Sequence, residues 1–454
     1  MLIKFKVENF RSFGKEVEFS CLATPERGHR DRVFEGRQAG LRLLTVGAIY
    51  GANASGKSNL FRAIELARKL VVSGVALEAP IPVQPFRLNA KWIDAPTRFY
   101  FEVLVKDQVF AYRFAVNAQA VVEESLTEIR PASGRLIFSR EVSAKGETTW
   151  DLKHFENKDL NAGEIQFVEF VAKGTPRNQL FLMEAHSRNV IFFNDLWDWF
   201  RNSLVLVQPN ATIPGLEFKL QQKDLHDFCT RFLHGVDVEI DRLGTKPVSL
   251  DSINLPKEVR QNLENNCKEG MGAFVMNGGN RLSFRREKGE LKAAKQVSYH
   301  KVDGRNESVA FDIEDESDGT RRLLDFLPIF YELANPKTEL VVFVDEFDRS
   351  LHSKLTRALI ENYLACQPTN ARSQLLFTTH DATLLDHELL RKDEIWLVDK
   401  NEKRESELSS LGDFKLRSDK RLMKDYLLGR FGGVPNIQRL PLSPTAILAT
   451  VKED

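Results

Sequence analysis

The stretch Gly51-Ala52-Asn53-Ala54-Ser55-Gly56-Lys57-Ser58 matches G-x-x-x-x-G-K-[ST], the pattern of a phosphate-binding loop. The apolar run from Leu43 to Tyr50 precedes it and is typical of a buried strand. Asn59 to Val72 follows it and carries apolar residues at helical spacing. Strand, glycine turn and helix therefore occur in the order that a phosphate loop needs, which argues against a chance glycine turn.

The residue types in this loop have physical reasons. Glycines let the backbone wrap closely around phosphates with N–H groups pointing inward, and the positive end of the following helix adds attraction. Lys57 is expected to reach the β- and γ-phosphates of a nucleotide, and the Ser58 hydroxyl to sit on Mg²⁺. We therefore predict a nucleotide site with Mg²⁺ whose loop residues are Asn53, Ala54, Ser55, Gly56, Lys57 and Ser58.

Composition limits the class of protein. The chain has 454 residues, of which 42% are hydrophobic, enough for one large or two ordinary domains. Its formal net charge of +0 provides no global field toward nucleic acid or membranes. The four cysteines are isolated, which predicts neither a metal motif nor a disulfide framework. Because no signal peptide or transmembrane-length apolar run is visible, we expect a cytoplasmic protein that does not contact a membrane.

The pattern of hydrophobic residues changes several times along the chain. Residues 1–22 are predicted to form a hairpin, and residues 98–142 an antiparallel meander of short strands. Residues 155–235 are mostly helical in pattern, and residues 236–312 are mixed. From residue 316 onward strands and helices alternate, which predicts a parallel sheet with both faces covered.

A second acidic motif stands at the end of a predicted buried strand, Leu340 to Val344. It is followed by Asp345 and Glu346, and ligands of α/β sheets bind at such strand ends. Asp345 would hold Mg²⁺ through its water shell, and Glu346 would polarise an attacking water as general base. The alternative is a solvated acidic turn, which the phosphate loop in the same chain makes the weaker interpretation.

The long separation between Lys57 and Asp345 resembles that of ABC-type ATPases of the SMC/RecF-like branch, where an insertion divides the nucleotide-binding domain. The resemblance implies an α/β fold with an antiparallel β lobe and a mostly helical insertion. We expect an N-terminal half over residues 1–150, an insertion over 151–312 and a C-terminal half over 313–454. Because the chain has no long heptad region, no extended coiled coil is expected.

Further motifs of this family are present. Ser317 and Gly319 open a helix and resemble the ABC signature, which would contact the γ-phosphate of an ATP held by a second protomer. An ordinary helix N-cap is the alternative for the motif taken alone. His380 follows the next strand and resembles the switch histidine that senses the γ-phosphate and water. Asp318 departs from the common glycine, which puts the strength of that trans contact in doubt.

Two further candidates come from the resemblance. The segment Asn9-Phe10-Arg11-Ser12-Phe13 is similar to the opening of RecF- and SMC-like ATPases, where the arginine approaches the nucleotide. Arg11 is therefore a nucleotide-binding candidate. Gln84 lies where a Q-loop glutamine that contacts the metal could fall, although the prolines around it leave that alignment open.

The segments VQPFRL, DEFDRSLH and YLLGRFGGVP resemble the RloA-type ATPases of bacterial phage-defence and restriction-associated operons, over most of the chain except about 205–300. This resemblance implies an ATP-binding and ATP-hydrolysing switch that works as a homodimer or higher homo-oligomer. It also implies a separate effector, a TOPRIM/OLD-like or RloB-type nuclease, and either DNA or a phage protein as trigger.

Two other functions stay open from the sequence. A RecF-like DNA-binding repair ATPase would need a basic surface, for which the stretch from Arg281 to Arg305 is the candidate, although a solvated hairpin explains it equally well. The other is a scaffold that binds ATP but barely hydrolyses it.

Overall fold

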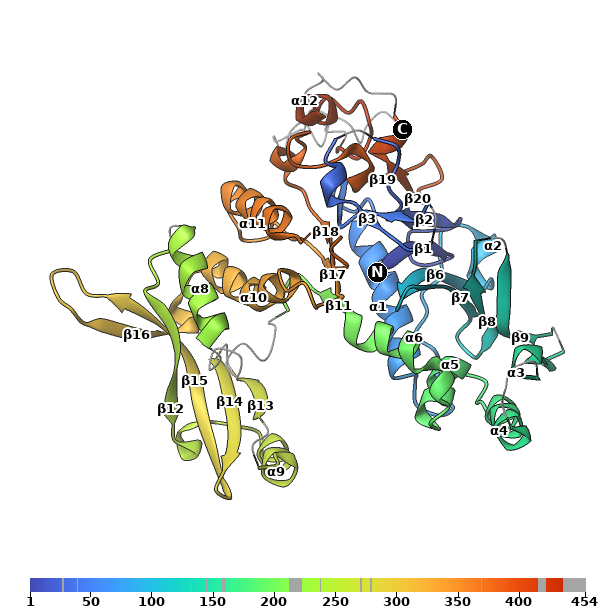
Figure 1. Cartoon of the computed structure of the whole chain (residues 1–454), viewed down its shortest axis with the longest axis horizontal. Helices are drawn as coiled ribbons and strands as arrows, with labels where there is room; N and C mark the ends of the chain where they lie inside the picture. Colours follow the sequence, from blue (N-terminus) through green and yellow to red (C-terminus); the bar gives the residue numbers. More distant parts are fainter. Residues whose placement is uncertain are drawn as a thin grey trace, which may run out of the picture.

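The computed structural model describes residues 1–26, 28–38, 40–131, 133–143, 145–156, 161–211, 223–236, 238–269, 272–277, 280–368, 370–414 and 422–435. Figure 1 shows a larger body that holds both of the large sheets, and a smaller lobe that extends from it and holds a third sheet. Helices α8 (Lys223–Gly235) and α10 (Asp318–Leu333) lie between the two parts.

The central sheet has six strands in the order β11-β17-β18-β5-β19-β20. The first five strands are mutually parallel, and β20 runs antiparallel at the edge. Strands β5, β17 and β18 consist only of buried residues, as parallel strands covered on both faces must. The strands are Leu204–Val207 (β11), Val341–Val344 (β17), Gln374–Thr378 (β18), Val46–Gly51 (β5), Ile395–Lys400 (β19) and Ser406–Ser410 (β20).

This sheet joins parts of the chain that are far apart in sequence, because β5 pairs directly with β18. Helix α1 (Lys57–Val72) packs on one face, where Phe61 meets Phe343 with ring centroids 5.4 Å apart. Helices α10 and α11 (Ser353–Cys366) pack on the other face against Val342 and Val344. The predicted α/β fold with a split sheet is therefore confirmed.

The second sheet is antiparallel and has the order β10-β9-β8-β7-β6-β1-β2. It contains the predicted hairpin and the predicted meander, which are joined because β1 pairs with β6. Its apolar residues share one core with α1. The strands are Leu2–Glu8 (β1), Val17–Ser20 (β2), Thr97–Val105 (β6), Gln108–Val116 (β7), Val121–Ile129 (β8), Gly134–Val142 (β9) and Thr148–Asp151 (β10).

The inserted region differs from the expectation in two places. Its first part is helical as predicted, with α4 (Ala162–Lys173), α5 (Phe181–Ser187) and α6 (Asn194–Asp198), but β11 then enters the central sheet beside β17. The apolar sequence of β11, which includes two valines, suits a strand covered on both faces. Its pairing with β17 is what selects a strand over the helix that the surrounding pattern predicts.

The part of the insertion with mixed pattern is mainly β structure. It forms a five-stranded antiparallel sheet with a small core of its own around Leu282 and Phe284. The strands are Arg242–Val248 (β12), Gly272–Asn277 (β13), Asn280–Glu287 (β14), Glu290–Lys301 (β15) and Ser308–Asp312 (β16), and α9 spans Lys257–Asn266.

The remaining elements are short. The longest helices in the described ranges, α1 and α10, have 16 residues each, so no long coiled coil occurs there, as predicted. None of the described helices combines the length and the apolar character needed to cross a membrane. The other helices and strands are Ala90–Ile93 (α2), Lys153–Glu156 (α3), Leu422–Leu427 (α12), Phe34–Glu35 (β3) and Arg42–Leu43 (β4).

Candidate nucleotide site

Three strand ends bring the predicted residues together. Strands β17, β18 and β5 are adjacent and parallel, so their carboxyl ends meet at one edge of the sheet. The phosphate loop follows β5, the pair Asp345 and Glu346 follows β17, and His380 follows β18. Residues from positions 51 to 380 are therefore assembled at a single edge.

The phosphate loop is supported by two serines that the sequence reasoning missed. Gly56 has a φ of 125°, and a Cβ there would lie 2.9 Å from Ser12 Oγ and closer still to Ser406 Oγ. Ser12 Oγ accepts a hydrogen bond from Asn59 Nδ2 at 2.8 Å, and Ser406 Oγ donates to the Ser55 carbonyl. Ser12 belongs to the quoted Asn9–Phe13 motif, whereas no sequence signal marks Ser406 because β20 places it there.

Lys57 is held over its own loop. Its Nζ donates to the carbonyl oxygens of Gly51 at 2.6 Å and of Ala52 at 3.1 Å, and the residue is only 6% exposed. Burial lowers the pKa of Lys57 to about 8, although the nearby carboxylates of Asp345, Asp348 and Glu346 act to raise it. A buried ammonium group beside open backbone N–H groups is a suitable partner for phosphate oxygens.

Asp345 is the most buried acid of the site, with 3% exposure. Its Oδ1 accepts hydrogen bonds from Thr378 Oγ1 at 2.6 Å and from Ser58 Oγ at 3.2 Å. A hydroxyl and a carboxylate at one point are the hard oxygen ligands that Mg²⁺ uses in phosphate sites, where it keeps several waters. No group of three or more His, Cys, Asp or Glu side chains that could hold a metal ion occurs in the described ranges.

Glu346 leaves β17 in an unusual conformation. Its φ of 52° lies in the left-handed region, which is uncommon for residues other than glycine. Its backbone N–H donates to Thr378 Oγ1 at 2.8 Å, and its Oε2 lies 3.3 Å from Arg349 Nη1. Thr378 therefore holds both acids with one hydroxyl, a role that only the neighbouring position of β18 reveals.

His380 lies beside the segment that follows Glu346. Its backbone N–H donates to the Asp348 carboxylate, at 3.3 Å and 3.2 Å from the two oxygens. Partial burial and the charge of Lys57 hold the pKa of His380 below its ordinary value, against the raising effect of the three nearby carboxylates. The imidazole is therefore neutral at pH 7 and can donate or accept a hydrogen bond.

The signature turn lies at the start of α10. Ser317 is exposed and caps the helix, because its Oγ accepts a hydrogen bond from the Thr320 N–H at 3.1 Å. A Cβ at Gly319 would lie 2.6 Å from the Ser350 carbonyl oxygen, so only glycine fits this close approach to the segment after β17. Within the described part of the chain, no hydrogen bond links Ser317 or Gly319 to the phosphate loop.

Arg11 and Gln84 lie next to each other. The Arg11 N–H donates to the Gln84 carbonyl at 2.7 Å, and both residues line a cavity with Arg62 and Glu65 of α1. Burial is the main cause that lowers the pKa of Arg11. No hydrogen bond among the described residues connects either side chain to the residues that surround Asp345, so their nucleotide and metal roles stay predictions.

Internal contacts engage most of the basic side chains between Arg281 and Arg305. Counted among the described residues, five of the eight make ion pairs, and Arg286 donates to backbone carbonyls. This observation gives no advantage to the DNA-binding alternative. The contacts join Arg281 to Asp325, Arg285 and Lys292 to Glu287, Lys295 to Asp312, Lys301 to Asp241, and Arg286 to the carbonyls of Glu264, Cys267 and Gly289.

Comparison with known proteins gives one family. The family described as "AAA domain, putative AbiEii toxin, Type IV TA system" matches residues 47–386, well over half of the chain. Among solved structures, the chain is similar to the SMC head domain from Thermotoga maritima, with 14% identity, a TM-score of 0.34, and coverage of 90% of this chain and 98% of that one. It is also similar to the recombination mediator protein RecF, with 14% identity, a TM-score of 0.27, and coverage of 84% and 92%. No curated protein sequence matches the chain.

Proposed function

This chain belongs to the family described as "AAA domain, putative AbiEii toxin, Type IV TA system", and we propose that it is an ATP-hydrolysing switch of the ABC type. The observation that carries this proposal is the set of contacts made by Thr378. Its hydroxyl joins Asp345 and the Glu346 backbone beside the phosphate loop. This arrangement supports the proposal, because a phosphate-binding loop and a general base would then share one sheet edge.

The residues of the site have distinct roles in this proposal. Lys57 and the backbone of the loop bind the phosphates and neutralise their charge. Glu346 takes the proton of the attacking water, and His380, neutral at pH 7, orients that water or the γ-phosphate. Ser58 and Asp345, which are hydrogen-bonded to each other, would hold Mg²⁺, and the ion would supply charge stabilisation at the phosphates.

The exposed signature turn supports assembly into a dimer. Ser317 and Gly319 make no hydrogen bond with the phosphate loop of their own chain in the described ranges, and Ser317 is exposed at the start of α10. In the proposed homodimer each turn faces the ATP of the partner, so that two ATP molecules are enclosed between two chains. ATP binding then closes the dimer, and hydrolysis reopens it.

The biological role proposed for the switch is anti-phage defence of the RloA type. This step rests on the motif resemblance and on the family description, which names a toxin system. The dimer would hold or release a separate nuclease of TOPRIM/OLD-like or RloB type when a phage protein or DNA is sensed. Co-purification from the native operon tests it, since recovery of the chain without a nuclease partner would count against the role.

The substitution Glu346→Gln tests the catalytic part of the proposal. It keeps the shape of the side chain and removes its basicity, so ATP hydrolysis should fall by about 10²- to 10⁴-fold. ATP should still bind, and a dimer should accumulate in ATP, as measured by light scattering during gel filtration. Glu402→Gln is the matched control, because Glu402 is exposed and distant in sequence from the motifs.

Two results would contradict the proposal. Unchanged hydrolysis in the Glu346→Gln protein would remove the assignment of the base. Negligible hydrolysis by the unaltered protein, with ATP bound, would favour the scaffold that binds ATP without turning it over.

A further inference from the structure

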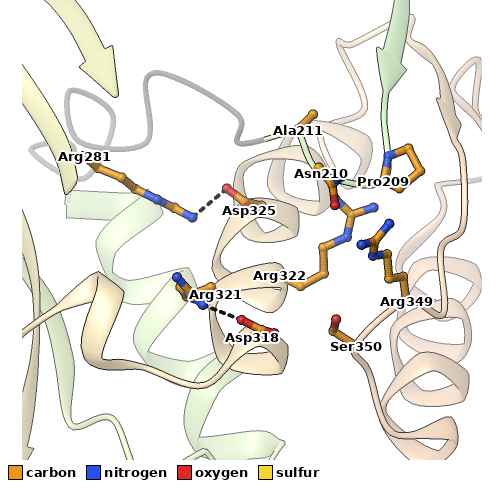
Figure 2. Close-up of a pocket in the computed structure, with 10 residues that line it drawn as sticks. All are labelled: Pro209, Asn210, Ala211, Arg281, Asp318, Arg321, Arg322, Asp325, Arg349 and Ser350. Atoms are coloured by element: carbon orange, nitrogen blue, oxygen red, sulfur yellow. Dashed lines mark hydrogen bonds and ion pairs between the residues drawn. The ribbon is translucent and has the colours of Figure 1, made fainter. Parts of the chain in front are cut away.

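A polar cavity, separate from the phosphate loop, lies beside the signature turn. Its volume is about 290 Å³. Figure 2 shows that α10 forms one wall, the segment with Arg349 and Ser350 another, and the residues after β11 a third, with Arg281 of β14 reaching in from the smaller lobe. The lining residues are Pro209, Asn210, Ala211, Arg281, Asp318, Arg321, Arg322, Asp325, Arg349 and Ser350.

The charge of this lining is positive. Four arginines and two aspartates contribute, a balance of +4 against −2, or +2. Arg281 pairs with Asp325 at 2.9 Å, and Arg321 pairs with Asp318. Arg322 makes no ion pair with another described residue, and its Nη1 donates to the Gln208 carbonyl at 3.3 Å. Burial lowers the pKa of Arg322, while the Asp325 carboxylate, which is already paired with Arg281, acts to raise it.

Two of these guanidinium groups are buried and only partly satisfied. Arg281 is 3% exposed and Arg322 is 6% exposed. Arg281 Nη1 and the Nε and Nη2 atoms of Arg322 have no hydrogen-bond partner among the described residues. A buried donor without a partner destabilises the folded chain, and more so when it is charged. Both guanidinium groups therefore keep unused donors beside a positive cavity, and an acceptor there would satisfy them.

We propose that this cavity is a second anion site, which binds a phosphate-type oxyanion between α10 and the Arg349–Ser350 segment. A tetrahedral oxyanion has several acceptor oxygens and can meet donors that come from different walls. Planar guanidinium groups are well suited to it. The volume is near the lower end of the range for small-molecule pockets, which fits free orthophosphate or the terminal phosphate of a nucleotide.

Arg349 connects this site with the proposed base. Its guanidinium lines the cavity, and its Nη1 lies 3.3 Å from Glu346 Oε2. An oxyanion in the cavity would compete with Glu346 for the same cation and free the carboxylate to accept a proton. This consequence rests on the proposed function, whereas the binding of the anion does not.

Binding is tested with radiolabelled orthophosphate and equilibrium dialysis, on the full chain carrying Lys57→Ala to weaken the phosphate loop. We expect one saturable site per chain. Adding Arg322→Met, which keeps an apolar contact with Phe326, should weaken binding at least tenfold. Arg260→Met, on the distant helix α9, is the matched control and should change nothing. Labelled ADP is tested in parallel. If the cavity binds the terminal phosphate of a nucleotide, ADP should bind to the Lys57→Ala protein and lose this binding when Arg322→Met is added.

A second substitution, expected to strengthen phosphate binding, keeps the test valid even if the Arg322→Met protein misfolds. The Asp318 side chain is 75% exposed, so Asp318→Asn should fold normally while removing one negative charge from the cavity. Phosphate should then bind several-fold more tightly. No saturable binding of either probe, or binding indifferent to both Arg322→Met and Asp318→Asn, would overturn the site.

The link to Glu346 has its own experiment. Added phosphate competes with ATP at the phosphate loop of both the unaltered and the Arg322→Met protein, so their rates are compared as a ratio. This ratio, unaltered over Arg322→Met, should rise as phosphate is added, because only the unaltered protein keeps the second site. A constant ratio would remove the link. Failure of the proposed function would instead appear as hydrolysis that survives Glu346→Gln in the absence of added phosphate.

Discussion

The phosphate loop and the signature turn both contain serine and glycine and both open a helix of 16 residues, yet they are held differently. The start of α1 has no side-chain cap and is surrounded by Ser12 and Ser406. The start of α10 is exposed and capped by its own Ser317 hydroxyl. One turn is therefore enclosed by other parts of its own chain, and the other is complete as a helix end and exposed.

The hydroxyl of Ser317 can serve both roles. A hydroxyl has two acceptor lone pairs and one proton, and the cap uses a lone pair for the Thr320 N–H. Its oxygen also lies 2.9 Å from Thr320 Oγ1, where either hydroxyl can donate, and a phosphate oxygen could replace this contact. The comparison thus predicts that the phosphate loop acts within its chain and that the signature turn acts across the dimer.

The largest expected effect comes from mixing two inactive proteins. Lys57→Ala and Ser317→Arg should each reduce hydrolysis on the order of a hundredfold, because each removes one side of every shared site. After mixing and exchange of subunits, each mixed dimer keeps one intact site, so about a quarter of the full activity should return. Steady-state phosphate release measures it.

Each protein measured alone is the control for this experiment. If Ser317→Arg alone hydrolyses ATP normally, or if mixing restores nothing although subunits exchange, the two turns do not form one site.

A smaller effect is expected on the free energy of unfolding, which should depend more on the contacts of Thr378 beside the phosphate loop than on the cap of the signature turn. Thr378→Val removes the hydroxyl that satisfies Asp345 and Glu346, so the free energy of unfolding should fall by about 1 to 3 kcal/mol and hydrolysis by about tenfold or more. Ser317→Ala removes only an exposed cap and should cost about 1 kcal/mol. Urea unfolding of the nucleotide-free proteins gives both values, and a larger loss for Ser317→Ala would reverse the comparison.

The smallest effect concerns pH. Because the pKa of His380 lies below its ordinary value near 6.5, the imidazole stays neutral at pH 7 and gains its proton only in more acidic solution. Protonation places a second cation near Lys57, so hydrolysis should decline a few-fold as pH falls through the pKa of His380, below pH 6.5. His380→Gln should show no such decline below pH 6.5. A profile unchanged by this substitution would show that His380 does not titrate in the reaction.

Local sequence patterns were sufficient for much of the fold and for part of the site. The hairpin, the meander, α1, α11 and β18 follow from hydrophobic periodicity, and the phosphate loop and the acidic strand end follow from short motifs. These features depend on neighbours in sequence, since glycine conformations, helix spacing and runs of buried strand residues are local properties.

Other features were decided only by tertiary contacts. The pairing of β5 with β18 brings Thr378 to Asp345, β20 brings Ser406 to the phosphate loop, and β11 joins the central sheet from a region of helical pattern. The buried arginines beside the signature turn come from α10 and from the β14 strand of the smaller lobe. Such groups meet across long sequence separations, and a serine, threonine or arginine carries no local sign of the partner that folding will give it.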